Sequence, residues 1–255
     1  MDTRLLIRPG NRSHRVFTPS PLVAKPDFLT NQVRKMPIVT VASPKGGAGK
    51  STASVILGTE LAYAGAEVCI LDCDPNLSIS IWAERAPLPP RVSVRSDVGE
   101  SEIVRTLKQE DADGRIVIVD LEGVASRLVS RAISQSDLVL TPMRATTLDA
   151  TISVRALALV AEEEEALGRS IKQAVVFTMT RAIKSKQHTA IEGSLRGQGV
   201  DIIDPPLMER AAFSALFEFG GDLRTLPAQG RMEPALENAS EFARAVYARL
   251  TGSNR

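Results

Sequence analysis

The sequence predicts an α/β fold with a doubly wound, mostly parallel sheet flanked by helices, in a Rossmann-like three-layer arrangement. Two observations predict it. From Pro37 onward, short apolar runs rich in β-branched residues alternate with segments of helical spacing, which is the pattern of a parallel sheet covered on both faces. Between the first apolar run and the first helix lies the glycine-rich stretch 44–52, Pro-Lys-Gly-Gly-Ala-Gly-Lys-Ser-Thr.

That stretch has the surroundings of a phosphate-binding loop. Residues 37–43 read as a buried strand, and 51–63 carry small and apolar residues at helical spacing. Glycines allow successive backbone N–H groups to turn inward and bind an anion, and the helix N-terminus adds its dipole. Lys50 would then place its charge between the β- and γ-phosphates, and the Ser51 hydroxyl would ligate Mg²⁺.

The second strand, 68–72, ends in two carboxylates. Asp72 and Asp74 are two residues apart, so on an extended strand they point the same way, about 6.6 Å apart. Pro75 keeps Asp74 out of the helical region. A capping turn of Asp, Pro and Asn would explain the same residues, but ligands of doubly wound sheets bind at strand exits. We therefore favour a functional carboxylate pair.

A third carboxylate, Asp120, ends the buried strand 115–120, which is a Walker B pattern, and would hold Mg²⁺ through a water molecule. The remaining chain continues the alternation. Strands are expected near 92–94 at an edge, at 138–141 and at 174–178, and a last strand or turn near 199–206. A short helix or turn is expected at 79–84, and helices at 98–109, 126–134, 147–167, from 208 onward and at 233–250.

The loop departs from the ordinary Walker A pattern, because Pro44 replaces its first glycine and Lys45 adds a second lysine. It resembles the deviant Walker A loop of the ParA/MinD family of dimeric P-loop ATPases over about residues 37–250. The resemblance implies that Lys45 reaches across a homodimer to the partner's phosphates, so that two ATP molecules lie between two chains. It also implies that Asp74 positions the attacking water and that Gly123 senses the γ-phosphate.

By the same resemblance, the catalytic residues are Lys45, Lys50, Asp74 and Asp120, and the cofactors are ATP or ADP with Mg²⁺. Hydrolysis should be slow and should depend on an activator protein. Asn76 stands where the family more often has Gln, and Thr180-Arg181 where relatives often have Asn-Arg. The expected nucleotide contacts are Lys45, Gly46, Gly47, Ala48, Gly49, Lys50, Ser51, Thr52, Gly123, Thr180, Arg181 and Pro206; the expected Mg²⁺ ligands are Ser51 and, through water, Asp72 and Asp120.

Composition sets the wider limits. The chain has 255 residues, 44% of them hydrophobic, and a net charge of +1. We expect a basic, proline-containing arm at 1–36 and one ATPase domain at 37–255. No signal peptide or membrane span is apparent, and the two cysteines, Cys69 and Cys73, are expected to be reduced, as in a bacterial cytoplasmic protein. The arm carries seven Lys or Arg against two Asp, which suits contact with nucleic acid or an anionic surface, or else a solvated, disordered leader.

Three outputs of such an ATPase compete. The first is ParA-like segregation of a plasmid, chromosome or other cargo, with nonspecific DNA binding and nucleoid association in the ATP state. The second is MinD-like membrane positioning, which the poorly apolar segment 241–255 argues against. The third is a metabolic P-loop enzyme such as an amidoligase. Scattered solvated charges are the alternative reading of the candidate DNA contacts, which are Lys184, Lys186, Arg196, Arg210, Arg224 and Arg231.

Within the first class, the segment Pro-Leu-Met-Glu-Arg-Ala-Ala-Phe at 206–213 also resembles VirC-type ATPases, which promote conjugative DNA transfer. Conjugation therefore stands beside partition as an expected role.

Overall fold

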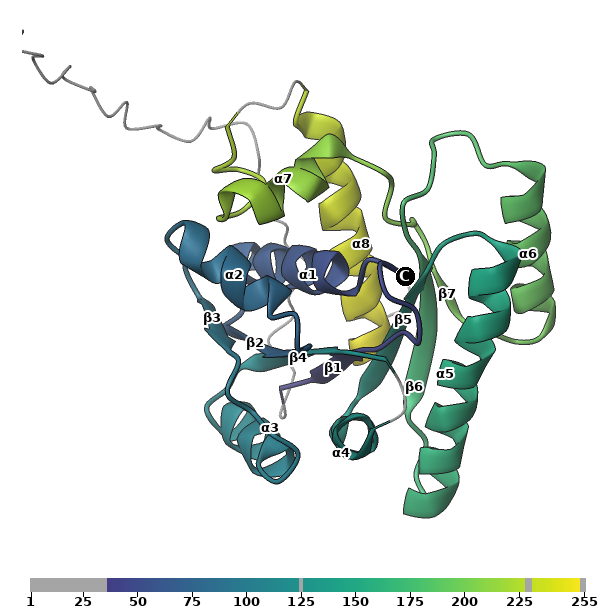
Figure 1. The fold of residues 1–255 in the computed structure, drawn as a ribbon, viewed down its shortest axis with the longest axis horizontal. Coiled ribbons are helices and arrows are strands. Elements are labelled where there is room, and N and C mark those ends of the chain that lie inside the picture. Colours follow the sequence, from purple (N-terminus) through teal and green to yellow (C-terminus); the bar gives the residue numbers. More distant parts are fainter. Residues whose placement is uncertain (1–35, 124–125, 228–230, 253–255) are drawn as a thin grey trace, which may run out of the picture.

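The computed structural model describes residues 36–123, 126–227 and 231–252. Within them, seven strands form one parallel sheet in the order β3-β2-β4-β1-β5-β6-β7 (Figure 1). The strand order reverses beside β1, where a doubly wound sheet opens a crevice for a ligand. The strands are β1 Ile38–Val41, β2 Val68–Cys73, β3 Val92–Arg95, β4 Ile116–Leu121, β5 Leu138–Met143, β6 Lys172–Phe177 and β7 Ile202–Ile203.

Helices cover both faces of this sheet, so the fold class predicted from the sequence is confirmed. The cluster that includes Val39 and Ile70 packs under α1, α2, α7 and α8, and that of Leu71 and Val119 packs under α3, α4 and α5. A third cluster packs β5, β6 and β7 against α5 and α6. The helices are α1 Lys50–Ala64, α2 Ser78–Arg85, α3 Ile103–Ala112, α4 Arg127–Gln135, α5 Thr147–Leu167, α6 Lys186–Gly197, α7 Ala211–Phe219 and α8 Glu233–Thr251.

Helix α1 follows the glycine-rich loop and packs closely on the sheet at Gly58. A Cβ added at Gly58 would come within 2.8 Å of the Ile70 side chain on β2. The glycine therefore lets α1 settle against β2 and β4, where Asp72 and Asp120 lie opposite each other in register. This packing brings the start of α1 to the carboxyl ends of the strands.

The largest differences from expectation are in three helices. Helix α6 lies in a stretch where no element was expected. Helix α3 begins at Ile103 rather than at 98, because 96–102 form an irregular segment and a turn, and α7 begins at Ala211 rather than at 208. β3 lies at the edge of the sheet, as its short, charged sequence predicts. The expected arm, apart from Met36, lies outside the described residues.

Candidate nucleotide-binding site

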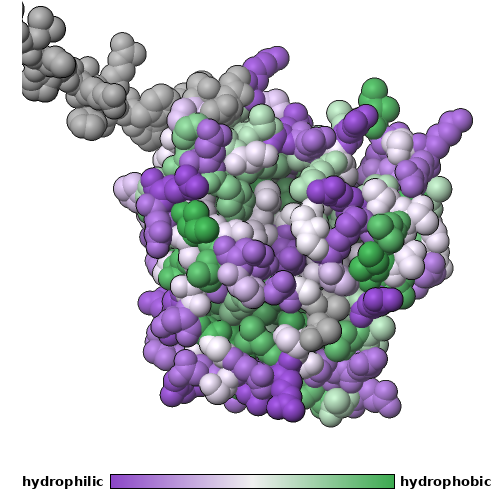
Figure 2. All heavy atoms as spheres, in the orientation of Figure 1, coloured by the Kyte–Doolittle hydropathy of each residue, from purple (hydrophilic) through white to green (hydrophobic). Residues whose placement is uncertain are grey.

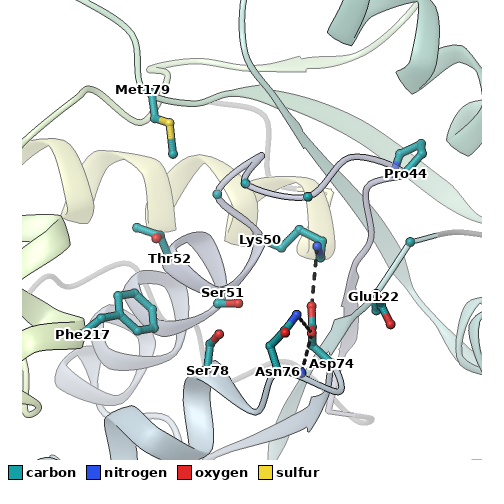
Figure 3. A pocket seen from close by; sticks show the side chains of 14 residues that line it. Pro44, Lys50, Ser51, Thr52, Asp74, Asn76, Ser78, Glu122, Met179 and Phe217 are labelled. Carbon is teal, nitrogen blue, oxygen red and sulfur yellow. Dashed lines mark hydrogen bonds and ion pairs between the residues drawn. The ribbon is translucent and has the colours of Figure 1, made fainter.

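A cavity of about 410 Å³ opens at the carboxyl ends of β1, β2 and β4, over the N-terminus of α1 (Figure 3). It receives residues from the glycine loop, the exits of β2, β4 and β6, and helix α7. Its lining is Pro44, Gly46, Gly47, Gly49, Lys50, Ser51, Thr52, Asp74, Asn76, Ser78, Glu122, Gly123, Met179 and Phe217. Six of the eight residues expected from stretch 45–52, with Asp74 and Gly123, therefore share one cavity; Ala48 is buried and does not line it.

The loop is shaped by backbone conformations that favour glycine. Gly47 and Gly49 have φ of 70° and 87°, a region that side chains with a Cβ rarely adopt. A Cβ on Gly49 would also lie 3.3 Å from Thr178, whose hydroxyl donates to the Ala48 carbonyl at 2.7 Å. Thr178, directly after β6, thus holds the glycine loop in place at Ala48 and Gly49.

Lys50 and Asp74 face each other across the cavity in Figure 3, with Lys50 Nζ 3.7 Å from Asp74 Oδ2. Both side chains are about 8% exposed. Asp74 Oδ1 accepts hydrogen bonds from the backbone and side-chain nitrogens of Asn76, at 2.9 and 2.8 Å. Asn76 therefore orients Asp74 through a short turn.

Asp120 is fully buried beneath the loop and is bonded to α1. Its Oδ2 accepts from Ser51 Oγ at 2.7 Å and its Oδ1 from Ser54 Oγ at 3.2 Å. Burial raises the pKa of Asp120 to about 7, against the Ser51 hydrogen bond and the charge of Lys50, which lower it. A positive partner stronger than Lys50 would therefore favour the charged form of this carboxyl.

Asp72 is tied to α2, because its Oδ2 accepts from Ser80 N at 2.7 Å and from Ser80 Oγ at 2.8 Å. Its Oδ1 is buried and has no hydrogen-bond partner. In the described part of the chain, no group of three or more His, Cys, Asp or Glu could hold a metal by itself. Ser51, Asp120 and the buried, unpaired oxygen of Asp72 nevertheless fit Mg²⁺, which is usually held by one or two carboxylates together with phosphates and water.

A second cavity, of about 230 Å³, adjoins the first through Gly49, Thr52 and Met179, which line both. Its far wall is formed by residues 207–210 and by Phe213 and Ser214. Thr180, Arg181 and Pro206, expected to contact the nucleotide, do not line either cavity. Thr180 instead pairs with Met208 in a β-bridge, and the carbonyl of the buried Pro206 accepts a hydrogen bond from Asn238. The adjacent residues Met179 and Leu207 line the cavities in their place.

Lys45 does not line the first, 410 Å³ cavity, which we call the phosphate cavity after the glycine loop that borders it. Its Nζ instead forms an ion pair with Asp149 at the start of α5. The two lysines of the loop therefore serve different sides, with Lys50 inside the cavity and Lys45 outside it.

Two of the six candidate DNA contacts, Arg224 and Arg210, are engaged inside the protein. Arg224 donates two hydrogen bonds, at 2.7 and 2.9 Å, to the fully buried Glu60, and stacks on Tyr63. Its guanidinium is thus committed to the interior. Arg210 lines the second cavity and has a buried Nε without a hydrogen-bond partner, so it faces the cavity side. Lys184 and Arg196 are exposed and share Glu192, while Lys186 and Arg231 are exposed.

A glycine loop between β1 and α1, with acidic strand ends on β2 and β4, defines a P-loop ATPase of the deviant Walker A class. Comparison with known proteins agrees. The family described as VirC1 protein matches residues 36–236. The chain is 59% identical over 222 residues to Protein ParA of Rhizobium radiobacter, covering 86% of this chain and 100% of that protein.

Two further likenesses extend this result. Protein virC1 of Rhizobium radiobacter is 28% identical over 193 residues, covering 72% of this chain and 82% of that protein. The structure of a variant of Cyanothece McdA in complex with ATP superposes with a TM-score of 0.66 at 16% identity, covering 86% of this chain and 98% of that one, and so shares the fold. The chain therefore belongs to the VirC1 protein family, among the ParA-like partition ATPases.

Several residues of the site were not predicted. Ser78, Glu122, Met179 and Phe217 line the phosphate cavity, and Leu207, Met208, Glu209 and Phe213 line the second one. One signal was available for Glu122, which follows the Walker B strand. Nothing in the local sequence near 217 indicates that α7 turns toward a loop at 44–52.

Proposed function

We propose that this protein is a Mg-ATP-driven partition switch. Two chains close over two ATP molecules, the closed dimer binds DNA without sequence preference, and hydrolysis separates the chains and releases the DNA. Lys50 and the loop N–H groups hold the phosphates, and Asp74 orients the attacking water. Mg²⁺, when bound near Ser51 and Asp120, neutralises the phosphate charge.

The observation that carries this proposal is the division of labour between the two lysines. A single cavity needs one lysine for the phosphates, and Lys50 is already inside it, 3.7 Å from Asp74. Lys45 lies on the outer side of the same loop, beyond the cavity lining. A lysine there can serve a second nucleotide, presented by another copy of the chain.

The face around the cavity supports a second copy as the partner. Figure 2 shows a polar centre with hydrophobic groups on both sides, over α2 and over α5 and α6. Exposed apolar side chains on these elements or at their starts are Leu77, Ile81, Leu148 and Val154, between 41% and 62% exposed. Apolar patches beside a polar site are typical of faces that pair with protein.

Membrane positioning is disfavoured by the use of α8. Its large apolar residues Phe242, Val246 and Tyr247 are at most 5% exposed and pack in the core, so they are not free for a lipid surface. None of the helices in the described residues is both long enough and apolar enough to cross a membrane.

Duplex DNA and anionic vesicles tested separately, each with Mg-ATP and with Mg-ADP, would test this function. We expect binding to DNA only in ATP, with an affinity that falls as salt rises and does not depend on sequence. Replacing Lys184 and Lys186 by Glu should weaken it at least tenfold, because each lysine can neutralise a phosphate. Lys108→Glu, on the exposed face of α3, is the matched control. ATP-dependent vesicle binding without DNA binding would reject the proposal.

Asp74→Ala should trap the ATP dimer. The change removes the carboxylate that would orient water but leaves the loop, so we expect turnover to fall by about two orders of magnitude or more while ATP is retained. Phosphate release measures turnover, and light scattering on the same sample measures the ATP dimer. Unaltered turnover would mean that another group holds the water.

A conjugative role in DNA transfer is the second candidate. It is favoured by the match of the VirC1 family to residues 36–236. The two roles share the ATP switch and differ in cargo. Cells that carry both a partition locus and a transfer origin would distinguish them, because loss of this protein would impair partition in one case and transfer in the other.

A further inference from the structure

The connection between β6 and α6 presents a basic and fully exposed run of residues, which we call the basic tip. Its residues 181–187, Arg-Ala-Ile-Lys-Ser-Lys-Gln, are all exposed and hold three basic side chains and no acidic one. Within it, Ile183 is 87% exposed, more than any other large apolar side chain of the described residues. Figure 1 shows this connection projecting beyond the sheet, at the upper right. A single isoleucine among cations is thus held out in solvent.

Both ends of the basic tip are fixed to the body of the protein. Before it, Thr180 N donates to Leu207 O at 3.3 Å, and Thr180 O accepts from Glu209 N at 2.8 Å. At its other end, the buried His188 donates its backbone N–H to Ser185 Oγ at 3.1 Å. A short segment anchored on both sides has little conformational freedom left to lose when it inserts into a partner.

The cations of the basic tip can turn toward an anion without leaving a carboxylate unpaired. Lys184 Nζ donates to Glu192 Oε2 at 2.7 Å, but Glu192 Oε1 also accepts from Arg196 at 3.1 Å. Glu192 therefore keeps a counter-charge when Lys184 moves to a phosphate. Arg181 and Lys186 add two more exposed charges to the same segment. The basic tip thus matches a polyanion such as duplex DNA.

The surroundings of Ile183 favour DNA over a protein or a membrane as its partner. The core of a protein interface is depleted of charge, whereas three cations lie within three residues of Ile183. Membrane-surface segments present several large apolar side chains on one face, and the basic tip has only this one. Proteins that bend DNA without reading its sequence insert an apolar side chain between base pairs while cations contact the phosphates.

We propose that Ile183 is a wedge that the ATP-bound dimer inserts between neighbouring base pairs, so that binding bends the duplex. The inference rests on the proposed DNA binding and adds what the contact does to the DNA. Such a wedge reads no base, and phosphate contacts of Lys184 and Lys186 offset the cost of unstacking. The basic tip begins two residues after Met179, which lines both cavities, so wedge and nucleotide share one edge of the sheet.

Ile183→Ser tests this, because it removes the apolar side chain and no charge. A duplex of about 20 base pairs with a donor and an acceptor dye at its ends reports bending by energy transfer. With Mg²⁺ and a non-hydrolysable ATP analogue, and with the duplex saturated by each protein, the unaltered chain should raise the transfer and Ile183→Ser should lose at least half of that rise. Its DNA affinity should fall by only about three- to tenfold, with the same salt dependence, because every basic side chain remains.

Two further variants serve as controls. Ile183→Leu keeps an apolar wedge and should bend the duplex as the unaltered protein does. Leu167→Ser changes another exposed apolar residue, 43% exposed, at the last position of α5 and at the opposite edge of the sheet. It should alter neither bending nor affinity. Thermal unfolding should be the same for all four proteins, since Ile183 is almost fully exposed.

A duplex that stays straight when the unaltered protein binds, or bending by Ile183→Ser equal to that of the unaltered protein, overturns the wedge and leaves the proposed DNA binding standing. Sedimentation without DNA should show the same ATP-dependent dimer for both proteins; loss of the dimer in Ile183→Ser would place this residue in a protein interface and overturn the inference. Vesicle binding that Ile183→Ser abolishes would do the same. An unaltered protein that binds no DNA rejects the proposed function, and this inference with it.

Discussion

Lys50→Ala is expected to abolish useful nucleotide binding, with the dissociation constant for ATP raised by about two orders of magnitude or more. Lys50 is the lysine that lines the phosphate cavity, and Asp74 and Asp120 lie close by. Without it, the phosphate charges would meet Asp74, and Asp120 beneath it, with no side-chain cation among the residues that line the cavity. Calorimetric titration with Mg-ATP and with Mg-ADP measures the loss, which should be similar for both nucleotides.

Lys108→Ala is the matched control, since it removes a lysine from the exposed face of α3 and should bind ATP normally. Thermal unfolding without nucleotide should be run on both variants, because Lys50 also pairs with Asp74. ATP affinity that is unchanged in a folded Lys50→Ala protein would refute the assignment of the loop.

Lys45→Ala should leave nucleotide binding to the monomer intact and remove the ATP-dependent dimer. Lys45 does not line the phosphate cavity, so ADP affinity should stay within about twofold of the unaltered value. If Lys45 reaches the partner's phosphates, its removal takes away a desolvated charge contact at each of two sites, and about a 100-fold weaker dimer is expected. Sedimentation with Mg-ATP gives the dimer fraction, and calorimetry gives ADP affinity.

The double variant Lys45→Ala with Asp149→Asn guards against a trivial explanation. It removes both members of the ion pair, so no buried carboxylate is left unpaired. Loss of the dimer in the single and in the double variant assigns the effect to the missing lysine. A normal ATP-dependent mass shift in both would remove the cross-dimer role.

The sheet could be predicted from the sequence because most of its strands are buried on both faces. Runs such as Arg-Ile-Val-Ile-Val-Asp at 115–120 read as strands without tertiary information. Helix α6 could not be predicted in the same way. Its buried residues are only His188 and Leu195, with Ile191 partly buried, and its sequence holds two glycines, so the periodic apolar signal is weak.

The site divides along similar lines. The loop and the carboxylates at 72, 74 and 120 lie next to strand ends, and local sequence therefore indicates their place. The second cavity and the Lys45–Asp149 pair are made by residues 100 or more positions apart, and only the folded chain brings them together. The pairing of Arg224 could not be predicted for the same reason, since nothing near Arg224 in the sequence reveals the buried Glu60 that it contacts.

In the nucleotide-free cavity, the polar groups expected to bind phosphate and Mg²⁺ already have partners within the protein. The ammonium of Lys50 forms an ion pair with Asp74, and the hydroxyl of Ser51 donates a hydrogen bond to Asp120. A triphosphate that binds must therefore displace the Asp74 carboxylate from Lys50 and the Asp120 carboxylate from Ser51. When the nucleotide leaves, the same contacts can form again. Such an exchange lowers the net affinity for nucleotide, because contacts within the protein are lost when it binds and regained when it leaves. This suits the proposed switch, which has to release its nucleotide after each round of hydrolysis.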